Sequence, residues 1–245
     1  MMKNLSAVLL AGRENRHLKT AKWTLPFGES TVLNRTLDAY LDAGAAEVVV
    51  VLASRSDEVR ASLGTILSSA RGSKVRLVEA SDPEGNSGLL LREGVAAIAG
   101  NGRSFALGSG EQPLLTAELL TTLAEAFAAG KKKILAPVCQ GAIGQPVFFD
   151  ASLAKDFARL KNDGDAWEIL KAHSDEVNDL HRYETSLIRS IDDLEDYYAM
   201  LDIAKLPHPE LAQIEGTPQT STPEMATAPV DAGGETYHSD LADEQ

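Results

Sequence analysis

The sequence has a single cysteine, Cys139, in 245 residues. One thiol cannot form a disulfide within the chain, and such sparse use of cysteine is typical of a reducing compartment. Cys139 follows an apolar run, so we interpret it as a buried thiol rather than a nucleophile. No apolar run approaches the ~20 residues that span a bilayer, and the N-terminus lacks the pattern of a secretory signal. We therefore expect a cytoplasmic protein without a membrane segment.

Aromatic residues are also scarce, at 5% of the chain. The core must then be built from Ala, Leu, Val and Ile, which is common in parallel sheets covered by helices. The formal net charge of −13 argues against broad nucleic-acid binding, because that needs a cationic surface to displace phosphate counterions.

Residues 207–245 contain eight acidic residues and no Lys or Arg. The segment is punctuated by proline and has few large apolar residues, so it cannot bury enough surface to offset its chain entropy. We predict two parts: a folded domain over residues 1–206 and an acidic disordered tail over residues 207–245.

Short apolar runs alternate with helical spacing through the first part of the chain. Strands are predicted over residues 5–11, 47–53, 74–79, 104–107, 133–137 and 146–149, with an edge strand starting at Leu187. Helices are predicted over residues 30–43 (capped by Ser30), 57–69, 86–99, 116–129, 152–160, 166–172 and 193–203. This alternation predicts an α/β fold with a doubly wound, mostly parallel, Rossmann-like sheet, whose ligands bind beyond the carboxyl ends of the strands.

The loop after the first strand carries the clearest functional signal. Gly12 ends the strand, and four cations follow within ten residues: Arg13, Arg16, Lys19 and Lys22. Glycine lets backbone N–H groups approach a phosphate, while Arg and Lys supply positive charge to its oxygens. A solvated basic loop is the alternative, and composition alone does not decide between the two.

The order of motifs resembles the MobA-like nucleotidyltransferases, especially molybdenum cofactor cytidylyltransferases. The phosphate loop of that family is matched by Leu10-Ala11-Gly12, Arg16, Lys22 and Leu25-Pro26. Further matches are Gly94 in its helix, Gln112-Pro113, the run from Gly144 to Phe149, Gly164-Asp165 and the run from Ile191 to Asp196. Together the motifs cover residues 3–201 in order, and they imply the sheet of the nucleotide-diphospho-sugar transferases.

The resemblance implies an enzyme that moves a nucleoside monophosphate from an NTP, most simply CMP from CTP, onto a phosphate-bearing acceptor such as molybdopterin. It implies that Leu10, Ala11, Gly12 and Arg13 hold the triphosphate, that Arg16 neutralises the pyrophosphate, and that Lys22 contacts the α-phosphate. It implies that Glu111 and Asp192 hold Mg²⁺, a cation that prefers oxygen ligands. Asn86 and Ser87 lie in a second loop at the same sheet edge, where they could contact base or ribose.

Several positions depart from the family pattern. His17-Leu18 replaces Met-Gly, one extra residue precedes Lys22, Glu111 replaces an aspartate, and Ala166 replaces a glycine. A longer carboxylate shifts a metal by about 1 Å, which can cost roughly a hundredfold in rate. Three functions stay open: the cytidylyltransferase, a sugar-1-phosphate nucleotidyltransferase, and a non-catalytic relative that binds a nucleotide, a cofactor or a protein such as a molybdoenzyme.

Two of the predicted ligands have simpler interpretations. Glu111 could be an ordinary loop carboxylate, and Asp192 could be one of several acids favoured at a helix N-terminus. Trp23 is expected to pack behind the phosphate loop, with base stacking as the alternative.

Overall fold

The structure is a computed structural model, and it describes Met2 and residues 4–12, 21–53, 56–82, 85–99 and 102–210. Arg13, Arg16, His17 and nearly all of the predicted tail lie outside these residues. Within them, no helix is both long enough and apolar enough to cross a membrane.

The centre of the fold is one mixed sheet, in the order β10-β7-β9-β6-β1-β4-β5, with β8 paired to β7. Its strands are β1 (Leu5–Ala11), β4 (Glu47–Leu52), β5 (Val75–Glu79), β6 (Ser104–Ser109), β7 (Ile134–Cys139), β8 (Ala142–Ile143), β9 (Val147–Phe149) and β10 (Val177–Arg182). The pairs β1–β4, β1–β6, β4–β5 and β7–β10 are parallel, whereas β9 runs antiparallel to β6 and β7. The predicted mostly parallel sheet is confirmed.

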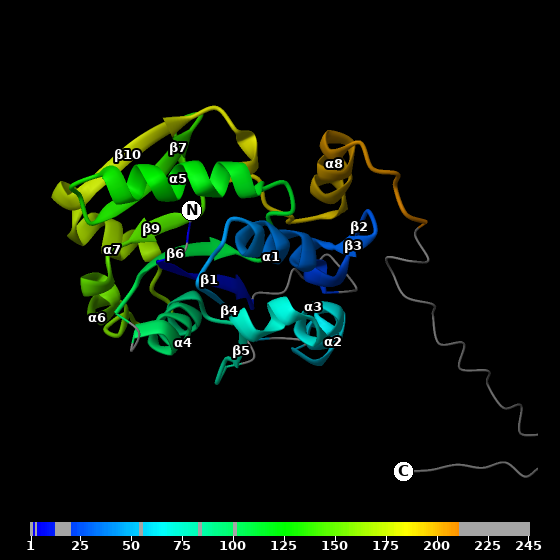
Figure 1. The fold of residues 1–245 in the computed structure, drawn as a ribbon, viewed down its shortest axis with the longest axis horizontal. Coiled ribbons are helices and arrows are strands. Elements are labelled where there is room, and N and C mark those ends of the chain that lie inside the picture. The colour runs from blue at the N-terminus through cyan, green and yellow to red at the C-terminus, as the bar shows by residue number, and fades with distance from the viewer. Residues whose placement is uncertain are drawn as a thin grey trace, which may run out of the picture.

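Helices cover both faces of this sheet, as Figure 1 shows. They are α1 (Val32–Asp42), α2 (Ser56–Ser62), α3 (Gly64–Ser68), α4 (Ser87–Ala99), α5 (Ala117–Ala129), α6 (Ala154–Phe157), α7 (Ala166–Ala172) and α8 (Leu194–Ala204). One core cluster joins the sheet to α1, α2, α3 and α5, and the other joins it to α4, α6 and α7. Each central strand is therefore buried on both sides, which explains the continuous apolar runs of β1 and β4.

A third cluster fixes α8 at the edge where the parallel strands β1, β4 and β6 end. There, α8 packs on the short hairpin of β2 (Pro26–Phe27) and β3 (Ser30–Thr31), and Figure 1 shows α8 on the opposite side of the molecule from α6 and α7. Tyr197 is buried in this cluster and donates its hydroxyl hydrogen to the carbonyl oxygen of Pro26. Helix α8 is thus held against the segment that follows the phosphate loop.

The structure corrects four predictions of local structure. Helix α1 begins at Val32 and is capped by Thr31, not Ser30, because the Thr31 hydroxyl accepts from the Asn34 N–H. The predicted helix 57–69 is two helices, because the Ser62 hydroxyl turns back to a carbonyl and Gly64 follows.

The other two corrections concern residues 152–187. The predicted helix 152–160 is a 3-10 turn followed by the short α6. The edge strand is Val177–Arg182, whereas Leu187 lies in a 3-10 turn that buries its side chain in the core.

Candidate functional site

The site forms where β1 and β6 end side by side. Their register pairs Leu10 with Ser109, and the Gly110 N–H donates to the Leu10 carbonyl at 2.9 Å. Leu10 and Ala11 are therefore strand residues whose backbone lies within the sheet, and the chain leaves the sheet at Gly12.

Gly12 lies in close contact with the segment before α4. A Cβ at Gly12 would lie 2.4 Å from Cδ1 of Leu90 and 3.2 Å from Cβ of Ala53. Gly85 has a φ of +69°, and a Cβ there would lie 2.6 Å from the Gly12 carbonyl oxygen. Gly85 therefore leaves no room for a side chain against the Gly12 backbone, whereas a Cβ at Gly12 would displace the Leu90 side chain, so the end of β1 and the loop before α4 approach each other closely.

Lys22 begins a 3-10 turn, Lys22–Thr24, and its ammonium is buried. Lys22 Nζ donates to the Ile191 carbonyl oxygen at 3.0 Å and forms an ion pair with the Glu111 carboxylate. The side chains of Lys22 and Glu111 are only 9% and 13% exposed. One ammonium thus joins three segments that are far apart in the sequence: the end of the phosphate loop, the β6–α5 loop and the approach to α8.

The environment of Glu111 raises the pKa of its carboxyl group above the usual range. Burial is the main cause, because it disfavours the charged form. The Lys22 ammonium opposes this by charge and hydrogen bonding, and the negative charge of Asp192 adds to the increase. The Lys22 ammonium also donates to the carbonyl oxygen of Ile191, the residue before Asp192, so the segment that carries Asp192 lies beside the Lys22–Glu111 pair.

Asp192 is exposed and is not the cap of α8. That role belongs to Asp193, whose Oδ1 accepts from the Asp196 N–H at 2.9 Å. The Asp192 Oδ2 accepts from the Ser190 hydroxyl at 3.4 Å. Asp192 directly precedes this cap, so the simpler interpretation as one of several acids at the N-terminus of α8 stays open beside that of a metal ligand.

Gln112 is a buried residue of the site that connects its loops. It is 4% exposed, and its Nε2 donates to the Leu187 carbonyl at 3.2 Å, with longer contacts to the carbonyls of Ser186 and Gln145. It thereby ties the β6–α5 loop to the segments before β9 and α8. The apolar run Pro113-Leu114-Leu115 that follows Gln112 could have indicated its burial from the sequence. A buried amide needs several hydrogen-bond partners, so such a residue is a candidate for connecting loops.

A cavity of about 210 Å³ opens beside Glu111. It is lined by three segments: Ser109, Glu111 and Gln112 of the β6–α5 loop, Ala142, Ile143 and Gln145 around β8, and residues 187–190 before α8.

The remaining predicted contacts are only partly described. Asn86 is exposed, and its amide donates to the Asp82 carboxylate, while Ser87 is the first residue of α4. Trp23 is 2% exposed and packs in the core behind the site, as expected. Among the described residues, no group of three or more His, Cys, Asp or Glu side chains is placed to hold a metal, so Glu111 and Asp192 form a pair without a third such ligand.

The profile of the MobA-like NTP transferase domain matches residues 7–177 of the chain. No curated protein is similar enough to count as a match.

Solved structures of three proteins share the fold. Rv0371c from Mycobacterium tuberculosis H37Rv has a TM-score of 0.68 and 24% identity, covering 81% of this chain and 98% of that one. A structure of Rv0371c in complex with manganese has a TM-score of 0.63 and 25% identity, covering 81% and 97%. A nucleotidyl transferase from Methanothermobacter thermautotroptrophicus has a TM-score of 0.66 and 22% identity, covering 81% and 96%. The 4-diphosphocytidyl-2C-methyl-D-erythritol synthase of Anaerococcus prevotii has a TM-score of 0.63 and 19% identity, covering 83% and 96%.

Proposed function

Because the chain belongs to the MobA-like NTP transferase family, we propose that it transfers CMP from CTP to a phosphate-bearing acceptor such as molybdopterin. The observation that carries the proposal is the convergence of Lys22, Glu111 and Asp192 at the carboxyl ends of β1 and β6. CTP is favoured over other donors by the later motifs of the sequence and by the cytidyl-transferring neighbour from Anaerococcus prevotii.

In this reaction an oxygen of the acceptor phosphate attacks the α-phosphorus of CTP. The new P–O bond forms as the bond to the β-phosphate oxygen breaks, and pyrophosphate leaves with the electron pair. The protein contributes positioning and charge neutralisation rather than covalent chemistry. We assign the triphosphate to the amides from Gly12 to Arg13 and the leaving pyrophosphate to Arg16.

Lys22 is assigned to the α-phosphate. Lys22 and Glu111 form an ion pair in the structure, and a triphosphate would give the ammonium a second anionic partner. Because the ammonium is held by the Ile191 carbonyl, it needs little reorganisation to serve that partner.

The donor set of the site fits a hard divalent cation. Glu111 and Asp192 offer carboxylate oxygens, and Mg²⁺ is commonly held by one or two carboxylates, several waters and the phosphates of its substrate. Burial raises the pKa of Glu111 and the negative charge of Asp192 adds to the increase, so further positive charge beside the two carboxylates would be favourable. A bound Mg²⁺ would neutralise phosphate charge in the transition state.

Substitution of Asp192 tests the assignment of the site. We expect Asp192→Asn to lower pyrophosphate release from CTP and the apparent affinity for Mg²⁺ by at least about tenfold, because a carboxylate ligand is lost. Glu195→Gln, an exposed acid in the first turn of α8, is the matched control. Assays with molybdopterin and with glucose 1-phosphate separate the two acceptor classes. Equal effects of the two substitutions would refute the role of Asp192.

A second function is favoured by the ion pair that Lys22 and Glu111 form with each other. Each group already satisfies the other, which suits a protein that binds a nucleotide, a cofactor or a protein partner such as a molybdoenzyme without turnover. Glu111→Asp distinguishes the two functions. A rise in turnover of up to about a hundredfold would indicate an enzyme limited by its longer carboxylate, whereas no turnover in either form would favour binding alone.

A further inference from the structure

The cavity beside Glu111 has the features of a second subsite. Its volume of about 210 Å³ is below the roughly 300 Å³ at which whole-ligand pockets usually begin. It can therefore enclose only one end of a substrate. Glu111 both lines this cavity and pairs with Lys22, so the cavity adjoins the position assigned to the α-phosphate.

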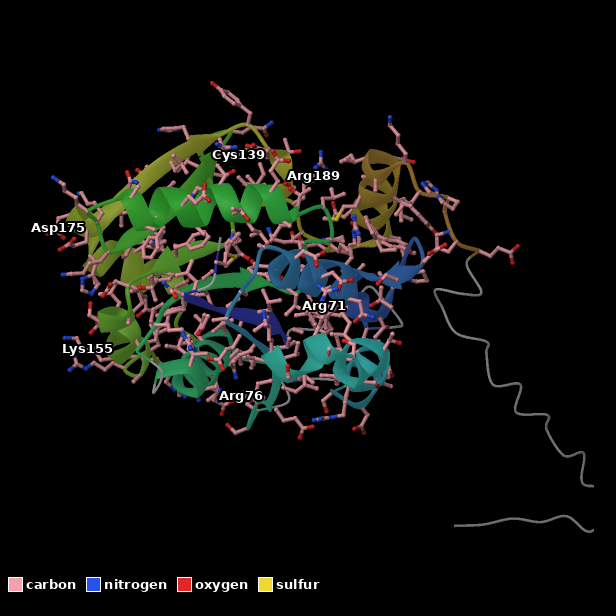
Figure 2. All side chains as sticks on the ribbon, in the orientation of Figure 1. Arg71, Arg76, Cys139, Lys155, Asp175 and Arg189 are labelled. Carbon is pink, nitrogen blue, oxygen red and sulfur yellow. The ribbon has the colours of Figure 1, made fainter. Side chains whose placement is uncertain are left out.

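Arg189 is the only cation among the described residues that line the cavity. Its side chain is half-buried, and its Nε donates to the Thr185 hydroxyl at 3.5 Å. In the part of the chain that the structure describes, no carboxylate pairs with Arg189, whereas the nearby Arg182 is paired with Glu184. Figure 2 shows Arg189 on the segment between β10 and α8. A guanidinium with unused N–H groups is suited to bind a phosphate with two parallel hydrogen bonds.

Gln112 provides a second, independent indication of a ligand. Its Nε2 faces three carbonyl oxygens, and this fixes the orientation of the amide. The opposite atom, Oε1, is buried and has no hydrogen-bond partner. An unpaired buried acceptor costs free energy, and a ligand N–H donor would satisfy it.

We propose that this cavity is the acceptor subsite, and that Arg189 binds the phosphate monoester of the acceptor beside Glu111. The inference rests on the proposed nucleotidyl transfer and specifies its acceptor. The acceptor would carry a phosphate monoester for Arg189 and, next to it, an N–H donor for the Gln112 Oε1. The segment before α8 would then determine the choice of acceptor, while the loop after β1 determines the choice of nucleotide.

The test uses phenyl phosphate as the probe and calorimetry on the full chain. We expect millimolar binding to the unsubstituted protein and about tenfold to a hundredfold weaker binding to Arg189→Ala, because a hydrogen-bonded charge is lost. Arg189→Lys should be intermediate, since it keeps a point charge but not the planar fork. Arg35→Ala is the matched control, because Arg35 is an exposed arginine on α1 that lines a different cavity. Melting temperatures verify that each variant is folded.

Equal affinities of Arg189→Ala and Arg35→Ala, or no binding by the unsubstituted protein, would overturn the inference. 4-Aminophenyl phosphate, which adds an N–H donor, should bind more tightly than phenyl phosphate, and equal affinity would overturn the Gln112 contact. CTP binding with Mg²⁺, measured on the unsubstituted protein, separates the two proposals. If CTP binds but Arg189→Ala has no effect, only the subsite fails. If CTP does not bind, the nucleotidyl transfer fails, while the phenyl phosphate result still decides the cavity.

Discussion

Replacement of Lys22 by methionine removes the cation that compensates Glu111. Because the two side chains are only 9% and 13% exposed, the substitution leaves a buried carboxylate without its partner. Breaking a buried ion pair in this way typically lowers the free energy of unfolding by about 3–5 kcal/mol. For a domain of this size each kcal/mol lowers the melting temperature by roughly 2–4 °C, so a decrease of about 6–20 °C is expected at neutral pH.

The cost of Lys22→Met should depend on pH in a defined direction. Folding raises the pKa of Glu111 above its ordinary value of 4.5, so its contribution to stability is complete below that value and is lost as pH rises through the folded pKa. Without the lowering effect of Lys22, the folded pKa rises further, and the loss extends to higher pH. The difference in stability between the two proteins should therefore be greatest at neutral pH and should shrink toward pH 4.5.

Urea unfolding monitored by tryptophan fluorescence measures this difference. Trp23 is buried beside Lys22, whereas Trp167 is 58% exposed, so a Trp167→Phe background leaves a single probe at the site. The double variant Lys22→Met/Glu111→Gln removes the buried charge and should recover most of the stability. A cost below about 1 kcal/mol, as for an exposed pair, or a cost that is constant with pH, would refute the reasoning.

Three further substitutions test the packing that supports the site. Gly94→Ala should lower the free energy of unfolding by about 1–3 kcal/mol, because the new Cβ would lie 2.6–2.7 Å from methyl groups of β1 and β4. Gly64→Ala is the control in the same unfolding assay: a Cβ there meets nothing within 4 Å, so the substitution should be neutral or stabilising. Gln112→Ala should lower stability by about 1–3 kcal/mol, because the carbonyls that it joins lose their donor, and an unchanged urea midpoint would contradict this role. Tyr197→Phe should cost about 1 kcal/mol by removing the bond to Pro26, and chemical denaturation with no measurable loss would show that this bond does not stabilise α8.

The fold was largely predictable because its central strands are buried on both faces. Residues 7–11 and 48–52 are continuous apolar runs, and Thr116 caps α5 as its position before the helix suggests. Strand β10 was not predicted because an edge strand is half exposed, and apolar and polar residues alternate only weakly in Val177–Arg182. The apolar pair Leu187-Ile188 resembles the start of a strand in the sequence, but Leu187 lies in a 3-10 turn. The antiparallel direction of β9 depends on long-range pairing, which a three-residue run does not encode.

Candidate site residues could be proposed from the sequence, but the contacts that they make could not. The resemblance selected Lys22, Glu111 and Asp192, and the structure pairs the first two of them, while the roles assigned to all three stay predictions. The bond from Lys22 to the Ile191 carbonyl spans 169 positions, and it depends on how α8 packs on the β2–β3 hairpin. Arg189 belongs to none of the matched motifs, and only the cavity marks it as a candidate. The roles assigned to Arg13 and Arg16, and to the other predicted phosphate-binding residues, likewise stay predictions.

Calorimetric titration of the full chain with CTP, GTP, ATP and UTP, each with and without Mg²⁺, tests the central claim most directly. We expect one NTP, CTP, to bind selectively and only when Mg²⁺ is present, because the triphosphate and the two carboxylates would share the cation. Binding of no NTP, or binding of all four without regard to Mg²⁺, would contradict a Mg²⁺-dependent cytidylyltransferase.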